Sequence, residues 1–158
     1  MSDLKETIRE KLILSRQNLL AVVENLNEEQ WAKAVFADSS EWSVSDLLRH
    51  LTDAERGMTA LVSQIKQGGE GVPADFDLQR WNKNRVTRLR DKSPAGLLND
   101  MTTNRSQLLT VLDTLEPADW AKQGRHGSLQ IMSIEQIFNL IADHEISHSN
   151  DIRKATTA

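Results

Sequence analysis

Two histidines near the end of the chain have the spacing of a shared metal site. His144 and His148 lie four residues apart in the segment DHEISH, residues 143–148. On a helix, side chains four residues apart project from one face, so both imidazoles can reach one ion. They continue a stripe of apolar residues at Ile134, Ile137 and Ile141, which directs them toward the protein interior. The spacing therefore indicates either a metal site or a pair of buried, hydrogen-bonded histidines.

His50 is the candidate for a third ligand, because it lies at the edge of an apolar helical stripe, one turn after Leu47 and one turn before Ala54. Three imidazoles without a fourth protein donor leave one position open for water or substrate, as in catalytic zinc sites. The chain has no cysteine, which excludes thiolate ligands and cysteine nucleophiles. His126 lies between glycines in a predicted loop, where a solvated histidine is expected, so it is left out of the site.

Carboxylates near these histidines are candidates to orient the ring nitrogens that do not bind metal. The first candidate for a further role is Glu55, one turn after Leu51, which we expect to reach the pocket as a general base. The alternative for each of these acids is a solvated position on a helix surface. The full set is Asp46, Asp53, Glu55, Asp143, Glu145 and Asp151.

The composition predicts one all-α domain covering residues 1–158. The chain has 19 lysines and arginines against 23 acidic residues, a net charge of -4, so nucleic acid is not an expected partner. No run reaches the roughly 18 apolar residues of a membrane span, and the first residues do not resemble a secretion signal. We therefore expect a cytoplasmic protein that does not bind membranes. Three prolines and seven glycines are few for a fold of many short strands.

Apolar residues at intervals of three and four predict four long helices. They cover residues 3–26, a segment from within 41–46 to a stop at Gly68-Gly69, residues 94–115 and residues 133–154. Between the second and third, a basic segment over 76–90 is also helical in pattern. The glycine-rich stretch 68–74 lacks the Gly-Lys-Ser/Thr ending of a phosphate-binding loop and is interpreted as a connection.

The chain contains an internal echo. The segment LNEEQWAK at 26–33 resembles LEPADWAK at 115–122, and the pattern of residues 43–55 returns 90 residues later at 133–145. A repeat of this kind predicts two helix hairpins that pack against each other as a four-helix bundle, with the segment 76–90 in the long middle connection. Chance similarity between amphipathic helices is the alternative, and the bundle is expected in either case.

Three segments resemble the DinB/YfiT-like family of metal-dependent enzymes. EWSVSDLLRHLTDAE at 41–55 is similar to the signature of that family's second helix, FDLQRWN at 76–82 to its Trp-Asn segment, and DHEISH to its final histidine pair. The resemblance covers nearly the whole chain. It implies a four-helix bundle, often a homodimer, with zinc or nickel held by three histidines, which here are His50, His144 and His148.

Characterised relatives in that family include transferases and isomerases that use a low-molecular-weight thiol such as bacillithiol or mycothiol. The resemblance therefore implies a transferase that moves such a thiol to an electrophilic small molecule. In that setting Trp81 and Asn82 are expected at the mouth of the site, with Arg85 meeting an anionic substrate or thiol cofactor; the alternative is a solvated basic face. Two other functions stay open: a non-catalytic metal- or ligand-binding bundle with a stress-response role, and a structural dimer with buried histidines.

Overall fold

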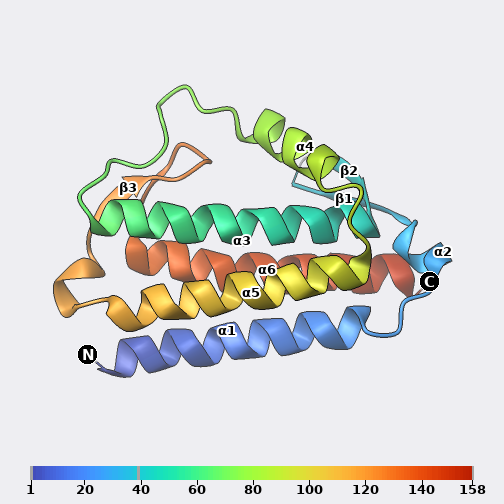
Figure 1. Cartoon of the computed structure of the whole chain (residues 1–158), viewed down its shortest axis with the longest axis horizontal. Helices are drawn as coiled ribbons and strands as arrows, with labels where there is room; N and C mark the ends of the chain where they lie inside the picture. Colours follow the sequence, from blue (N-terminus) through green and yellow to red (C-terminus); the bar gives the residue numbers. More distant parts are fainter. Residues whose placement is uncertain (1, 39, 158) are drawn as a thin grey trace.

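The computed structural model describes residues 2–38 and 40–157, in which four long helices lie side by side (Figure 1). The helices are α1 (Ser2–Val23), α3 (Val44–Lys66), α5 (Pro94–Thr114) and α6 (Ile134–Thr156). Their bounds agree with the predicted ranges to within about a turn, so the predicted four-helix bundle is confirmed. The segment expected to be helical over 76–90 forms α4 (Leu78–Arg88), which begins at the N-cap Asp77. None of the described helices combines the length and apolar character needed to cross a membrane.

Each half of the chain also contains short elements that the sequence did not predict. The first half has the one-turn helix α2 (Glu28–Trp31) and an antiparallel hairpin of β1 (Ala34–Ala37) and β2 (Ser40–Ser43). The second half has the 3₁₀ turn η1 (Pro117–Asp119) and a hairpin of β3 (Gln123–Arg125) and β4 (Ile131–Ser133). The order of elements is thus the same in both halves, and the echo in the sequence is a structural repeat.

The two halves agree in the detail of how a hairpin leads into a long helix. Ser43 and Ser133 are the N-caps of α3 and α6, and both have φ -77° and ψ 162°. In each half the first helical N–H donates to a lysine carbonyl that precedes the hairpin, Lys33 or Lys122, at 2.9 Å. A serine side chain satisfies a further free N–H of the first turn. These contacts fix each hairpin at the N-terminal end of its helix.

The arrangement of the long helices corrects one expectation. In the bundle α1 lies beside α6 and α5, and α3 lies beside α5 and α6. The two long helices of each half, α1 with α3 and α5 with α6, are therefore diagonal, and the two predicted helix hairpins are wrong. Figure 1 shows that α1 and α6 run in one direction while α3 and α5 run in the other. The neighbouring helices α3 and α6 are therefore antiparallel, and the start of α3 lies beside the end of α6.

The core consists of two apolar clusters with a charged layer between them. On α1, Leu12 belongs to one cluster and Leu19 to the other, and Arg16 lies between them. The other three long helices repeat this pattern around Glu55, Arg105 and Glu145, which are buried with their charges paired. Because one arginine and one glutamate come from each half of the repeat, the charged layer follows the internal symmetry.

Candidate metal centre

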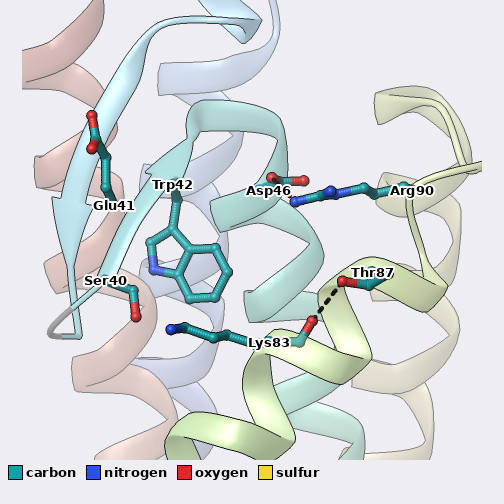
Figure 2. Close-up of a pocket in the computed structure, with 7 residues that line it drawn as sticks. All are labelled: Ser40, Glu41, Trp42, Asp46, Lys83, Thr87 and Arg90. Carbon is teal, nitrogen blue, oxygen red and sulfur yellow. Dashed lines mark hydrogen bonds and ion pairs between the residues drawn. The ribbon is translucent and has the colours of Figure 1, made fainter.

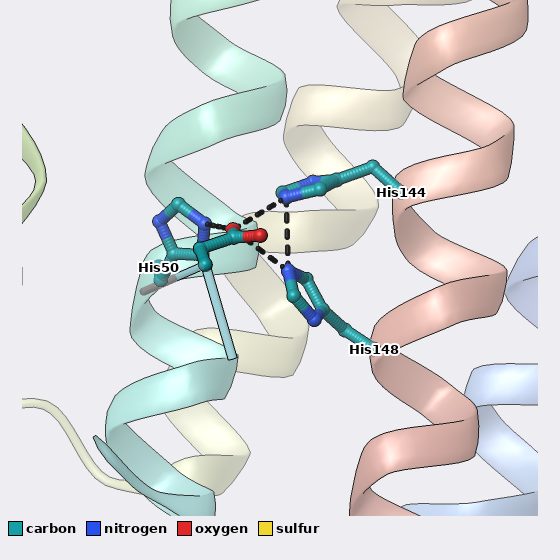
Figure 3. Close-up of side chains that lie close together, drawn as sticks. His50, His144 and His148 are labelled. Atoms are coloured by element: carbon teal, nitrogen blue, oxygen red, sulfur yellow. Dashed lines mark hydrogen bonds and ion pairs between the residues drawn. The ribbon is translucent and has the colours of Figure 1, made fainter. Parts of the chain in front are cut away.

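The three predicted histidines converge on one point (Figure 3). His50 comes from α3, and His144 and His148 come from α6. The Nε2 atoms of His144 and His148 lie 2.9 Å apart. His50 and His148 are buried, while His144 is half-buried. The antiparallel packing of α3 and α6 thus brings together histidines that are 94 and 98 residues apart in sequence.

Asp38 completes this cluster and was missed in the sequence. Its Oδ2 lies 2.8 Å from the Nε2 of His50, 3.0 Å from that of His144 and 2.9 Å from that of His148. The four candidate ligand atoms all lie within 4.8 Å of one another. Asp38 follows β1 with φ +50°, in the left-handed region that aspartate tolerates better than most residues. An Asp in a tight turn was the available signal, but without a predicted hairpin it pointed to no site.

Two further contacts hold the histidine rings in place. The Nδ1 of His148 lies 3.0 Å from Asp151 Oδ2, so Asp151 fulfils the orienting role expected of a nearby carboxylate. The indole of Trp42 stacks on His50, with ring centroids 5.8 Å apart and planes 5° apart. Trp42 also donates from Nε1 to the carbonyl of Ala37 at 3.0 Å. This hydrogen bond fixes the residue before Asp38 against the indole that stacks on His50.

The chemistry of the donor set fits a divalent transition metal. Burial lowers the pKa of His144, despite the opposing effect of Asp38, and so favours the neutral imidazole that binds metals. Burial also disfavours the charged form of Asp38, but hydrogen bonds from the three histidines outweigh it and hold the pKa of this carboxyl well below its usual range. Three imidazole nitrogens and one ionised carboxylate are ligands that zinc and nickel accept.

A cavity of about 820 Å³ opens from this cluster. His50, His144 and Asp38 form one part of its lining, and Trp81 and Asn82 of α4 form another, together with Arg85. The three residues expected at the mouth of the site therefore do line it. His126, which we expected to be solvated, also lines this cavity, although it contacts none of the clustered histidines through a described hydrogen bond.

Glu55 is not at this cavity, and its predicted role as a general base is corrected. Its carboxylate is buried in the charged layer, where Arg105 donates from Nε to Oε2 at 3.1 Å and from Nη2 to Oε1 at 2.8 Å. Arg16 Nη2 lies 3.3 Å from the same Oε1. The position one turn after Leu51 does point inward, as expected, but toward the centre of the bundle. A carboxylate held by two guanidinium groups has a structural role and no access to substrate.

A second, smaller cavity of about 410 Å³ lies beside Trp42 (Figure 2). It is bounded by the β2 strand, the start of α3 and one side of α4, and most of its lining is charged or polar. Arg90 Nη2 lies 3.2 Å from Asp46 Oδ2 across this cavity, so these two charges satisfy each other. The larger cavity, which shares residues with the histidine cluster, is therefore the candidate site.

Comparison with known proteins places the chain in a family. The structure is similar to that of YfiT from Bacillus subtilis, described as a probable metal-dependent hydrolase with an unusual four-helix bundle topology, with a TM-score of 0.73 and 19% identity over 95% of this chain and 86% of that one. It is also similar to a mycothiol-dependent maleylpyruvate isomerase, with a TM-score of 0.73 and 12% identity over 92% of this chain but 60% of that one. No curated protein sequence matches. A family model of the DinB superfamily matches residues 11–152, and the chain belongs to this superfamily.

Proposed function

We propose that this protein is a metal-dependent enzyme that transfers a low-molecular-weight thiol to an electrophilic small molecule. The observation that carries the proposal is the meeting of three histidine Nε2 atoms and one carboxylate oxygen at the wall of a cavity of about 820 Å³. His50, His144 and His148 would hold the metal, and Asp38 would be a fourth donor. Similarity to a mycothiol-dependent isomerase supports the thiol part of the proposal.

In this proposal, one set of residues would activate the thiol and another would bind the electrophile. A bound zinc or nickel ion would supply a Lewis acid that lowers the pKa of a thiol at an open or exchangeable position. Because the chain has no cysteine, the thiol has to come from a second substrate. Asp151 holds the ring of His148, and the Trp42 stack holds the ring of His50. Trp81 and Asn82 would then border the space in which the electrophile binds.

Elemental analysis tests the metal part first. Untagged protein, purified without a nickel column, is compared with the His50→Ala variant and with His126→Ala, a histidine of the same cavity wall outside the cluster. The proposal expects near-stoichiometric metal in the wild type and in His126→Ala, and its loss in His50→Ala. No metal in the wild type, even after zinc or nickel is added back, would remove the metal-dependent function.

Turnover assays test the transfer part. Thiols of low molecular weight are screened against electrophiles with the metal-loaded protein, and product formation should require both the thiol and the metal. Turnover of an ester or amide without any thiol would contradict thiol transfer and favour hydrolysis, the activity suggested for YfiT.

A non-catalytic metal-binding bundle is the second candidate, and Asp38 favours it. Four protein donors around one ion are typical of structural zinc sites, whereas catalytic sites keep a position open. If Asp38 closes the site, the wild type should bind metal without binding a thiol, and Asp38→Ala should gain thiol binding. Turnover by the wild type would instead show that Asp38 yields its position to substrate.

A further inference from the structure

The cavity beside the histidine cluster has a floor without a side chain. Gly57 lies in the interior of α3 and lines the cavity, and a Cβ added there would meet no atom within 4 Å. Gly57 does not have the positive φ that would require glycine, and no neighbouring atom excludes a larger residue. Glycine within a helix lowers stability relative to alanine. Neither packing nor backbone conformation requires this glycine, and its exposed position leaves open space against the helix.

Gly57 lies on the same face of α3 as His50. Seven residues separate them, which is two helical turns or about 10 Å along the axis. A molecule that reaches the histidine cluster with its reactive group would therefore lay the rest of its length over Gly57. Phe76 and Trp81, which also line the cavity, pack against each other with ring centroids 5.7 Å apart, and Trp81 is still 44% exposed. The walls suit a flat apolar body.

Two arginines of the cavity lining share one carboxylate. Asp53 Oδ1 accepts a hydrogen bond from Arg85 Nε at 2.8 Å and another from Arg56 Nη2 at 3.0 Å. All three residues line the cavity. The other carboxylate of the lining, Asp38, lies in the histidine cluster, so Asp53 alone faces the two guanidinium groups. Arg85 is also held over Trp81, 5.7 Å from the ring centroid. The wall can therefore bind an anionic group beside the aromatic surface.

We propose that the cavity takes amphiphilic organic anions, with the apolar body on Gly57 between α3 and Trp81 and the anionic group at Arg85 and Arg56. The proposal rests on the proposed function, because it names the class of substrate whose other end would reach the histidine cluster. The cavity volume of about 820 Å³ is within the range of roughly 300–1,000 Å³ for small-molecule sites. Gly57 is then the residue that decides whether a ring can lie on the helix.

Two dyes with the same rings test this proposal. 8-Anilinonaphthalene-1-sulfonate carries an anionic group, whereas N-phenyl-1-naphthylamine has the same rings without it. Both are titrated by fluorescence into wild type, Gly57→Ala, Gly57→Leu and Arg85→Gln. Gly57→Leu should weaken binding of both dyes by about tenfold or more, a change of 1.4 kcal/mol or more, and Gly57→Ala should weaken it less. Arg85→Gln should weaken binding of the sulfonate dye and leave the neutral dye unchanged.

Controls separate the cavity from the surface and from the metal centre. Phe36, which is 73% exposed and does not line the cavity, is replaced by serine and should not change binding of either dye. Gly57→Leu should keep its metal and should not lower the melting temperature, because leucine forms helices better than glycine. Loss of metal with dye binding retained would count against the proposed function alone.

Two results would overturn the inference. Equal binding of the sulfonate dye to wild type and Gly57→Leu would show that the floor over Gly57 is not the binding surface. Equal binding of the two dyes to the wild type, with no effect of Arg85→Gln, would show that the cavity does not select anions. Either result could occur with an intact metal centre, so the inference and the proposed function fail separately.

Discussion

Replacing Glu55 by glutamine tests whether this residue stabilises the bundle or acts in catalysis. The substitution keeps the shape of the side chain and removes its charge. Glu55 is 5% exposed and accepts three hydrogen bonds from Arg105 and Arg16. The layer of two arginines and two glutamates is neutral in the wild type. In the variant, Glu145 alone would face two guanidinium groups, that of the buried Arg105 and that of the half-buried Arg16.

The expected loss of stability is large. Removing one partner of a buried ion pair costs about 3–5 kcal/mol, because the other charge stays buried without compensation. In a domain of this size about 1 kcal/mol corresponds to 2–4 °C in melting temperature, so the variant should melt roughly 6–20 °C lower. Glu145→Gln should cause a loss of similar size, because Glu145 occupies the equivalent position in the second half. Asp143→Asn, which disrupts an exposed pair with Lys11, should cost about 1 kcal/mol or less.

The assay combines thermal unfolding with metal content and turnover. At a temperature where Glu55→Gln is fully folded, its metal content and turnover per folded molecule should match the wild type. A general base contributes about 10²–10⁴-fold to a rate, so its removal would have the opposite pattern. An unchanged melting temperature together with a hundredfold loss of turnover would refute the structural role assigned to Glu55.

Three other predictions concern metal, capping and pH. His144→Ala should lose its metal in elemental analysis while His126→Ala keeps it, and loss from His126→Ala alone would contradict the ligand assignment. Ser133→Ala should lower the free energy of unfolding in urea by about 1 kcal/mol, because it removes the α6 N-cap; the exposed Ser147→Ala is the control, and an equal effect would contradict the capping role. A backbone N–H and a neighbouring lysine lower the pKa of Asp119. Its carboxylate therefore stabilises the fold above the unfolded-state pKa of about 3.9. This contribution is lost as pH falls through the lower folded-state pKa, so the melting temperatures of wild type and Asp119→Asn should converge as pH falls below about 3.9. A constant difference would contradict this.

The sequence predicted the long helices because they depend on a local pattern. Apolar spacing is visible within one or two turns of chain. The sequence similarity between the two halves was also visible, and it indicated that the halves repeat the same structural unit. The neighbours of each helix were not predictable in this way. The interpretation as helix hairpins assumed that consecutive helices pack together, whereas the hairpins of β1–β2 and β3–β4 carry the chain to the diagonal position.

The sequence predicted the part of the site that lies on helices. His50, His144 and His148 project inward from stripes that the sequence shows, and the structure brings them together. Asp38 could not be found, because its position depends on a tight turn that places it against two helices distant in sequence. The wrong role for Glu55 has the opposite cause. An inward-facing acid can serve a pocket or a buried ion pair, and only the partners Arg16 and Arg105 on other helices decide between them.

The internal repeat explains why the metal centre and the apolar cavity share one face of the bundle. In the alignment of the two halves, the three histidines correspond to Leu140, Ala54 and Met58. All three of these residues line the cavity. At each of these three repeat positions, one half of the chain therefore has a histidine of the cluster and the other half has an apolar residue of the cavity wall. Because α3 and α6 are antiparallel, the two sets lie at successive levels along one helix pair, so side chains of the apolar wall can change without moving the histidines.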